Sequence, residues 1–348
     1  MPERDLAATT LELVAILSPT GEEERLCGYL DAWARALPCR PKLRRWRNGI
    51  VVEPPARHGG ARIGLFGHVD TVAPAADQPV EIRDGRVYGC GASDMKAGLA
   101  VMMALLEQAP SLSCDVVGVF YDREEGGYED NGLKPLLDPL PPLELGIVLE
   151  PTGNQLQMGC VGGLNATVRF RGRRAHSARP WQGDNALYRA IPFLQRLESR
   201  LPIEVRVEGL PFYEVMTPTV ASTHRSKNVV PDLFEINLNY RFAPGRSLES
   251  AERELLAMVG TEAEVEFTDR SPAGEVCLDQ PRIQAWLAAE KIPVEPKQAW
   301  TDVARLTARG IAAANFGPGD PAQAHQAGEW VEVAALEECR RKLERLLG

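Results

Sequence analysis

The stretch Arg62-Ile63-Gly64-Leu65-Phe66-Gly67-His68-Val69-Asp70-Thr71 decides the fold, because an apolar run leads directly into a histidine and an aspartate two residues apart. We expect residues 62–66 to form a buried strand that ends at Gly67, and open α/β sheets bind their ligands at the carboxyl ends of strands. Alternation along a strand points His68 and Asp70 the same way, so Asp70 can orient His68 as a metal ligand. Taken alone, the pair is more typical of a structural histidine beside a turn-capping aspartate.

Length, charge and cysteine usage restrict the class of protein. The 348 residues, 44% of them hydrophobic, suggest two domains or one large α/β domain with an insertion. The formal net charge of −9 argues against nucleic-acid binding, and the basic run at 44–47 is expected to be a solvated strand edge or turn. Seven scattered cysteines, with no Cys-x-x-Cys pair, indicate neither a disulfide framework nor a thiolate zinc site. Without a signal peptide or a run of roughly 18 apolar residues, a cytoplasmic protein with no membrane partner is expected.

Strands and helices alternate through most of the chain. Residues 20–23 resemble a capping box that begins a helix reaching about residue 37. The remaining elements expected here are strands at 62–66, 115–121, 146–149 and 311–316, and helices at 5–17, 95–108, 133–137 and 333–347. This order predicts an α/β fold, a mostly parallel sheet sandwiched between helices, in a catalytic domain formed by residues 1–163 and 273–348.

The pattern changes between residues 164 and 272. Residues 164–171 and 234–242 alternate strictly between apolar and polar side chains, as antiparallel strands with one solvated face do. Helices are expected at 184–201 and 247–259, with a further strand at 262–267. We therefore expect an inserted α+β domain with an antiparallel sheet.

Candidate metal and acid/base residues of the first domain cluster near the ends of these elements. They are His68, Asp94, Glu124, Glu125, Glu150 and His325. Two histidines and several carboxylates suit two zinc ions, because a shared carboxylate can bridge them. In a turn, one of the adjacent Glu124 and Glu125 can bind metal while the other reaches a water. The alternatives are a solvated acidic turn, a helix N-cap at Asp94, a glycosidase using a carboxylate pair, or a binding protein without chemistry.

Five segments together resemble the di-zinc deacylase and exopeptidase family. They are residues 67–71, 91–96, 122–126 and 150–152, and the late His325. The resemblance implies that His68, Asp94 and Glu150 hold one Zn²⁺, and that Asp94, Glu125 and His325 hold the other, with Co²⁺ able to substitute. It also implies that Asp70 orients His68 and that Glu124 is the general base.

The insert resembles the lid of the same family. Residues 174–180 are similar to the segment from which members send a histidine across a dimer interface, which implies that His176 is catalytic and that residues 164–272 form a homodimer. Residues 226–231 and 239–242 resemble lid motifs whose asparagine and arginine contact substrate. Substrate-binding residues implied or proposed on this basis are Asn228, Arg241 and Arg179.

The substrate is indicated by two late segments. Residues 301–306 and 315–321 resemble the shorter bacterial members that hydrolyse N-succinyl-LL-2,6-diaminopimelate in lysine and cell-wall biosynthesis. The resemblance therefore implies an amide hydrolase acting on this N-acyl amino acid. N-acetylornithine, N-acetyl-lysine and the substrates of related aminoacylases or carboxypeptidases remain alternatives, because the metal site is common to all these enzymes.

Overall fold

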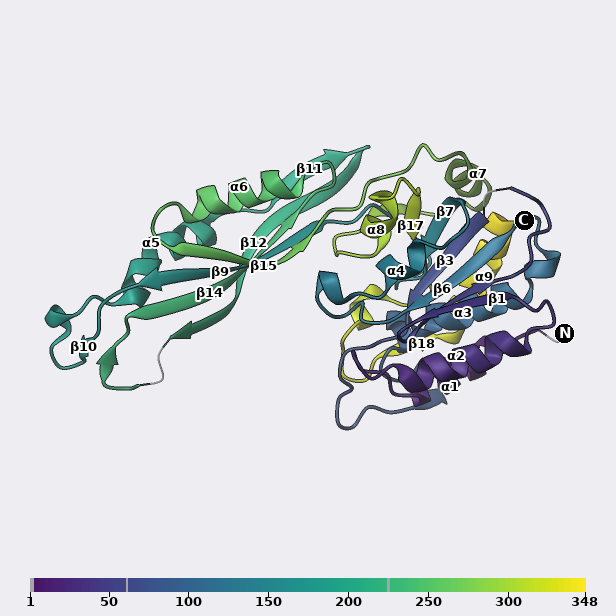
Figure 1. The fold of residues 1–348 in the computed structure, drawn as a ribbon, viewed down its shortest axis with the longest axis horizontal. Helices are drawn as coiled ribbons and strands as arrows, with labels where there is room; N and C mark the ends of the chain where they lie inside the picture. Colours follow the sequence, from purple (N-terminus) through teal and green to yellow (C-terminus); the bar gives the residue numbers. More distant parts are fainter. Residues whose placement is uncertain (1–2, 61, 224–225) are drawn as a thin grey trace. The chain divides into compact units, whose positions relative to one another are not determined.

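The computed structural model describes residues 3–60, 62–223 and 226–348 (Figure 1). Contacts within the chain divide it into two compact units. The first unit comprises Met1–Gly159, Glu275–Pro296 and Thr301–Gly348, and the second comprises Cys160–Gly274 and Lys297–Trp300. No helix within the described ranges is both long and apolar enough to cross a membrane.

A mixed sheet with four parallel central strands forms the centre of the first unit. Its strands are, in sheet order, β1 (Lys42–Trp46), β2 (Gly49–Glu53), β6 (Val116–Tyr121), β3 (Arg62–His68), β7 (Leu143–Val148), β17 (Ala313–Asn315), β8 (Leu156–Met158) and β16 (Val294–Pro296). Strands β6, β3, β7 and β17 run parallel, whereas β2 and β8 pair antiparallel with this central group. Every residue of β3 and β6 is buried, as is typical of parallel strands that are covered on both faces.

Helices cover both faces of this sheet. They are α1 (Leu6–Ala15), α2 (Glu24–Ala36), α3 (Ala97–Glu107), α4 (Leu133–Leu137), α7 (Pro281–Glu290), α8 (Val303–Thr307) and α9 (Val333–Leu347). Gly67 of β3 faces α3, because a Cβ added there would meet Leu99. Gly146 of β7 faces α8, because a Cβ added there would meet Leu306. Gly146 pairs with Gly64, and Gly64 and Gly67 are three residues apart on β3, so α3 and α8 lie on opposite faces of the sheet. The predicted α/β sandwich is therefore confirmed.

A small second sheet lies beside the main one in the first unit. It contains β4 (Glu81–Arg83), β5 (Arg86–Tyr88) and β18 (Trp330–Glu332), in the order β18-β5-β4. The pairing of β18 with β5 joins the late part of the chain to the segment that precedes α3. This connection positions two loops of the candidate site.

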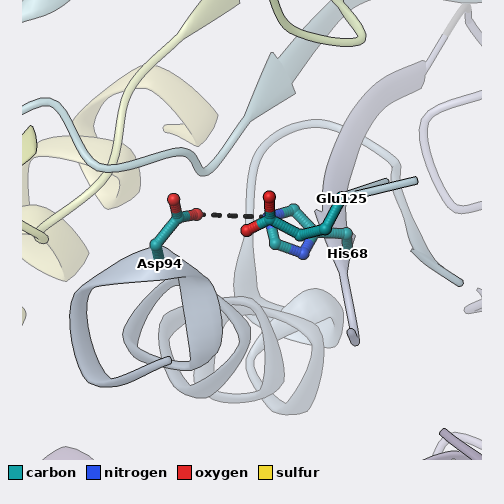
Figure 2. Close-up of side chains that lie close together, drawn as sticks. All are labelled: His68, Asp94 and Glu125. Atoms are coloured by element: carbon teal, nitrogen blue, oxygen red, sulfur yellow. Dashed lines mark hydrogen bonds and ion pairs between the residues drawn. The ribbon is translucent and has the colours of Figure 1, made fainter. Parts of the chain in front are cut away.

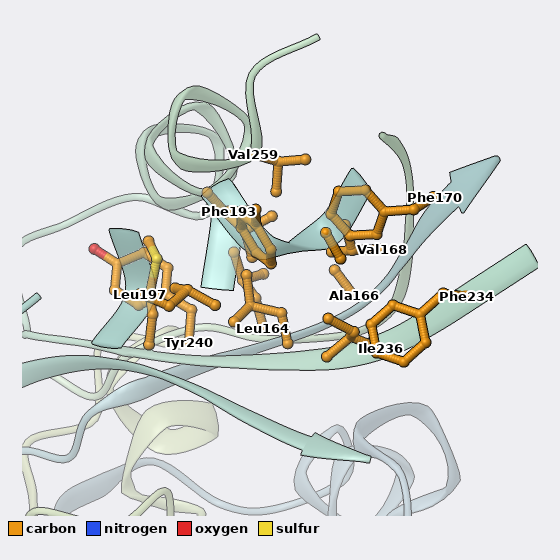
Figure 3. Close-up of a cluster of buried hydrophobic side chains, with 14 of the residues drawn as sticks. Leu164, Ala166, Val168, Phe170, Phe193, Leu197, Phe234, Ile236, Tyr240 and Val259 are labelled. Atoms are coloured by element: carbon orange, nitrogen blue, oxygen red, sulfur yellow. The ribbon is translucent and has the colours of Figure 1, made fainter. Parts of the chain in front are cut away.

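The second unit is an antiparallel sheet with two helices on one face. Its elements are β9 (Gly162–Arg171), β10 (Ala175–His176), α5 (Ala186–Ser199), β11 (Ile203–Val207), β12 (Leu210–Thr223), β13 (Val229–Val230), β14 (Leu233–Phe242), α6 (Leu248–Val259) and β15 (Glu264–Ser271). The large sheet has the order β11-β12-β14-β9-β15. Alternate side chains of β9 and β14, such as Phe170 and Tyr240, pack with Phe193 of α5 and Val259 of α6 (Figure 3). The predicted α+β architecture of the insert is confirmed.

One local prediction is wrong, and one long strand has no counterpart among the predicted elements. That strand is β12, which at 14 residues is the longest in the part of the chain that the structure describes. Helix α3 begins at Ala97 rather than near residue 95, because Asp94 and Met95 leave helical geometry, with φ of −118° and −133°. Asp94 therefore lies in the irregular turn Ala92–Lys96 and is not an ordinary N-cap.

Candidate functional site

The candidate side chains lie at the carboxyl ends of the central strands, at one edge of the sheet. His68 is the last residue of β3, the acidic turn follows β6, Glu150 follows β7, and the loop after β17 carries His325. Parallel strands place their carboxyl ends on the same side, so residues far apart in sequence converge. The turn before α3 adds Asp94 to this group.

The two oxygens of Asp94 face two different histidines. The Nε2 atom of His68 lies 3.2 Å from Oδ1 of Asp94 and 3.8 Å from Oε1 of Glu150. The Nε2 atom of His325 lies 2.9 Å from Oε1 of Glu125 and 3.8 Å from Oδ2 of Asp94. A carboxylate in this position can bridge two cations, with one imidazole and one glutamate completing each set.

His68, Asp94 and Glu125 point toward one another in Figure 2. One ligand atom from each lies within 4.8 Å of the others. Although these three alone could hold a single cation, Glu125 makes its ion-pair contact with His325, and Glu150 approaches His68. We therefore group Glu125 with His325, since ligands of ions about 3.5–4 Å apart necessarily lie close together.

The charges in the cluster favour cations. Burial raises the pKa of Glu124 well above its usual range, although His68 opposes the shift, and burial also raises the pKa of Glu125. Burial disfavours protonation of both histidines, yet hydrogen bonds with Asp70 raise the pKa of His68, and Glu125 raises the pKa of His325. The carboxylates thus draw positive charge into the cluster, a condition that two divalent cations satisfy.

Asp70 holds the acidic turn as well as the histidine. Its fully buried carboxylate accepts hydrogen bonds from the backbone N–H groups of Glu124 and Glu125 at 3.0 and 3.1 Å. The Nδ1 atom of His68 donates to the main-chain oxygen of Asp70 at 2.9 Å, and the carboxylate lies farther away, at 3.5 Å. Because Nδ1 carries the proton, Nε2 presents its lone pair toward Asp94.

The predicted capping box at residues 20–23 is wrong. Helix α2 begins at Glu24 without a side-chain cap, and the hydroxyl group of Thr20 donates instead to Oδ2 of Asp70 at 3.0 Å. The Glu23 carboxylate accepts from the backbone of Gly21 and from the side chain of Asn48. Thr20 therefore supports the residue that holds the acidic turn.

Two buried acids near the cluster were not identified from the sequence. Glu329 accepts hydrogen bonds from the turn that carries Asp94, and burial raises its pKa to about 7 against the backbone N–H groups that lower it. Asp302 accepts from the side-chain amide of Asn131 at 2.9 Å and pairs with Arg305 at 2.9 Å. The only sequence signal for Glu329 is its place four residues after His325.

In the second unit, strand pairing brings His176 and Asn228 together. His176 of β10 pairs with Val229 of β13, and the backbone N–H of Ser177 donates to the carbonyl of Asn228. Both residues line a cavity of about 370 Å³ together with Arg174. The Nδ1 atom of His176 accepts from Ala178 at 3.1 Å, so in the neutral ring Nε2 carries the proton and is a donor.

The two candidate arginines lie elsewhere in the second unit. Arg179 is exposed in the turn after β10, and Arg241 is half-buried in β14, where its Nε atom donates to Asn239 at 3.1 Å. Neither lines the cavity beside His176. Burial lowers the pKa of Arg241, which marks its guanidinium as a desolvated cation.

Comparison with known proteins decides the family. Residues 64–348 match the profile of Peptidase family M20/M25/M40. The chain belongs to this family. The succinyl-diaminopimelate desuccinylase of Corynebacterium glutamicum is 34% identical to this chain, and the alignment covers 99% of this chain and 96% of the relative. The acetylornithine deacetylase of Myxococcus xanthus is 30% identical over 86% of the chain and 82% of that protein.

A solved structure supports the same fold for this M20/M25/M40 hydrolase. The M20 family metallo-carboxypeptidase of Sulfolobus solfataricus superimposes with a TM-score of 0.79 and covers 99% of this chain and 98% of its own. The two sequences are 14% identical, so this likeness concerns the fold alone. The predicted family and the predicted hydrolase class are both confirmed.

Proposed function

We propose that the chain is a di-zinc amide hydrolase that releases succinate from N-succinyl-LL-2,6-diaminopimelate. The observation that carries the chemistry is the placement of Asp94, whose two oxygens face the imidazoles of His68 and His325. The choice of substrate is supported by a desuccinylase relative that matches 99% of the chain. Removal of an acetyl group from N-acetylornithine is the second candidate, because a deacetylase relative matches 86% of it.

The donor set fits two Zn²⁺ ions. His68, Asp94 and Glu150 would hold one ion, and Asp94, Glu125 and His325 would hold the other. When bound, the ions polarise the amide carbonyl and activate the attacking water. The Nδ1 donation of His68 to the Asp70 carbonyl fixes the ring in the orientation that this role requires.

Glu124 is the proposed general base and acid. It follows β6 directly and is held through its own N–H group by the Asp70 carboxylate. Because burial raises its pKa, Glu124 can take a proton from the attacking water and return it to the leaving amine nitrogen. Glu125 faces His325 instead, which leaves Glu124 to move the proton.

His176, Asn228 and two arginines are the proposed substrate-contacting groups. His176 presents a proton on Nε2, which suits donation to a developing oxyanion in the active site of a partner subunit. The planar guanidinium groups of Arg241 and Arg179 suit the carboxylates of the substrate, and Asn228 supplies an amide next to His176. These roles stay proposals.

The substrate is tested by the ratio of kcat/KM for N-succinyl-LL-2,6-diaminopimelate and N-acetylornithine. We expect the succinyl compound to be preferred by at least about tenfold, since a site built for a carboxylate loses hydrogen bonds with an acetyl group. A preference for N-acetylornithine would select the deacetylase activity while leaving the proposed metal chemistry in place.

Metal removal tests the chemistry separately. Exhaustive chelation should abolish hydrolysis, and addition of Zn²⁺ or Co²⁺ should restore it with two ions per chain. Hydrolysis that survives complete removal of metal, checked by elemental analysis, would reject the proposal whatever the substrate.

A further inference from the structure

Glu329 is a buried carboxylate that binds the backbone of a neighbouring loop. Glu329 immediately precedes β18 in the sequence and is 2% exposed. Its Oε2 atom accepts from the N–H of Gly91 at 2.8 Å, and Oε1 accepts from those of Ser93 and Asp94 at 2.7 and 2.8 Å. Both carboxylate oxygens are therefore engaged by main-chain donors.

The loop that Glu329 binds contains the shared carboxylate of the metal centre. Gly91 has a φ of +81° and, as a glycine, offers no side chain of its own to cap the turn Ala92–Lys96 that follows it. A turn of this kind leaves several N–H groups without helical partners, and Glu329 accepts three of them. The conformation that presents Asp94 thus depends on a residue 235 positions later in the sequence.

The same contact joins the loops of two proposed ligands. Glu329 lies four residues after His325, and the carbonyl of Glu329 accepts from the N–H of Gly89 at 3.0 Å. The hydroxyl of Ser93 donates to the carbonyl of Trp330 at 2.8 Å. Glu329 and Trp330, which follow His325, are therefore bonded to the segment that precedes Asp94.

We infer that Glu329 is a positioning residue that places Asp94 relative to His325 and so sets the affinity for the second metal ion. This inference rests on the proposed dinuclear centre. Because both of its oxygens accept backbone N–H groups, Glu329 acts through Asp94 and is not itself a ligand. Partners of this kind typically change metal affinity or activity by about 10-fold to 100-fold when they are replaced.

The buried lysine of the same turn, Lys96, does not hold the backbone of the turn as Glu329 does. The ammonium group of Lys96 donates to the carbonyl of Ile16 at 2.8 Å, at the end of α1.

Replacement of Glu329 by glutamine would turn an amide NH₂ toward a backbone N–H, because a glutamine side chain has only one oxygen. Glu329→Gln therefore removes at least one hydrogen bond with little change in volume.

The test compares Glu329→Gln with Glu332→Gln. Glu332 is a matched control, because it lies only three residues after Glu329, at the end of β18, but is half exposed and pairs with Arg86. Stepwise Mn²⁺ binding is measured on metal-free protein by calorimetry, and the coupling between two Mn²⁺ ions is measured by electron paramagnetic resonance. We expect Glu329→Gln to bind the second ion about 10-fold to 100-fold more weakly and to show altered coupling, with the control unchanged.

Other outcomes separate the possible errors. Two ions bound to folded Glu329→Gln with wild-type affinity and coupling would overturn the inference, as would a lower melting temperature of the metal-free protein with unchanged affinity. If Glu329→Gln does not fold, Glu329→Asp keeps the charge on a shorter side chain and should show the same weakening of the second ion. Wild-type protein that binds fewer than two ions would instead contradict the proposed function.

Discussion

Two adjacent glutamates meet different surroundings, and the proposed chemistry depends on this difference. Asp70 accepts both of their N–H groups, which fixes the backbone of the turn. Glu125 then contacts His325 at 2.9 Å, while burial, with help from the nearby carboxylates Glu150 and Asp302, raises the pKa of Glu124. One carboxylate is thus available to bind metal and the other to carry a proton.

Substitution of the two glutamates should separate these roles. Glu124→Gln should lower kcat by about 10² to 10⁴ and keep two metal ions, since only proton transfer is lost. Glu125→Gln should lose metal, because it removes a charged ligand beside His325. Metal content after dialysis and kcat are measured for both variants, and equal metal loss in the two would contradict the division of roles.

The loop from residue 122 to residue 131 is clamped from the turn between β1 and β2. The guanidinium of Arg47 donates to Oδ1 of Asp122 at 3.0 Å and to the carbonyl of Asp130 at 2.6 Å. The carbonyl of Asp122 also accepts from Gly132 at 2.8 Å. Residues 44–46 of the basic run lie in β1 and Arg47 lies in the turn that follows, where it holds both ends of the loop that carries the proposed base.

Arg47→Ala should therefore impair catalysis without removing metal. We expect kcat to fall by roughly 10-fold to 100-fold, because small displacements of a catalytic group are costly. The buried Asp122 carboxylate also loses a partner, so unfolding should become about 1–3 kcal/mol easier. Activity, metal content and melting temperature are the measurements.

Arg45→Ala is the matched control, because Arg45 lies in β1 and its guanidinium contacts Cys27 instead. That variant should keep wild-type kcat. An Arg47→Ala enzyme with unchanged kcat would show that the clamp has no part in positioning the turn.

For the whole molecule, the second unit offers a surface for a second copy of the chain. Beyond Glu214, strand β12 pairs with β14 on one side, and its residues from Thr217 to Thr223 are exposed and uncharged. Exposed sheet edges of this kind are normally covered or charged. Tyr188 and Ile191 of α5 are also exposed. These features support the proposed homodimer through residues 164–272.

Subunit mixing tests both the dimer and action of His176 on the partner. Glu124→Gln and His176→Ala should each be nearly inactive, but a hybrid dimer would combine an intact base with an intact histidine at one site. Random exchange should restore roughly one quarter of wild-type activity, because half of the dimers are hybrid and each has one complete site. No recovery after exchange has been demonstrated by mass spectrometry would reject action across the interface.

The sequence by itself determined the class of fold and the candidate ligands, because both are encoded in local patterns. Apolar runs followed by polar residues locate strand ends, and parallel strands bring such ends together, as at His68 and Glu150. The strict alternation at 164–171 and 234–242 likewise predicted the antiparallel sheet.

Only the tertiary structure decided which groups hold these ligands in place. Thr20 resembles a helix cap but donates to Asp70, and Glu329 and Arg47 act on loops far from them in sequence. Strand β12 contains Pro211 and Pro218, which argue against a strand, and its order comes from pairing with β14. Such contacts depend on loops meeting in space, and no periodicity or spacing along the chain records which buried donor an acid will meet.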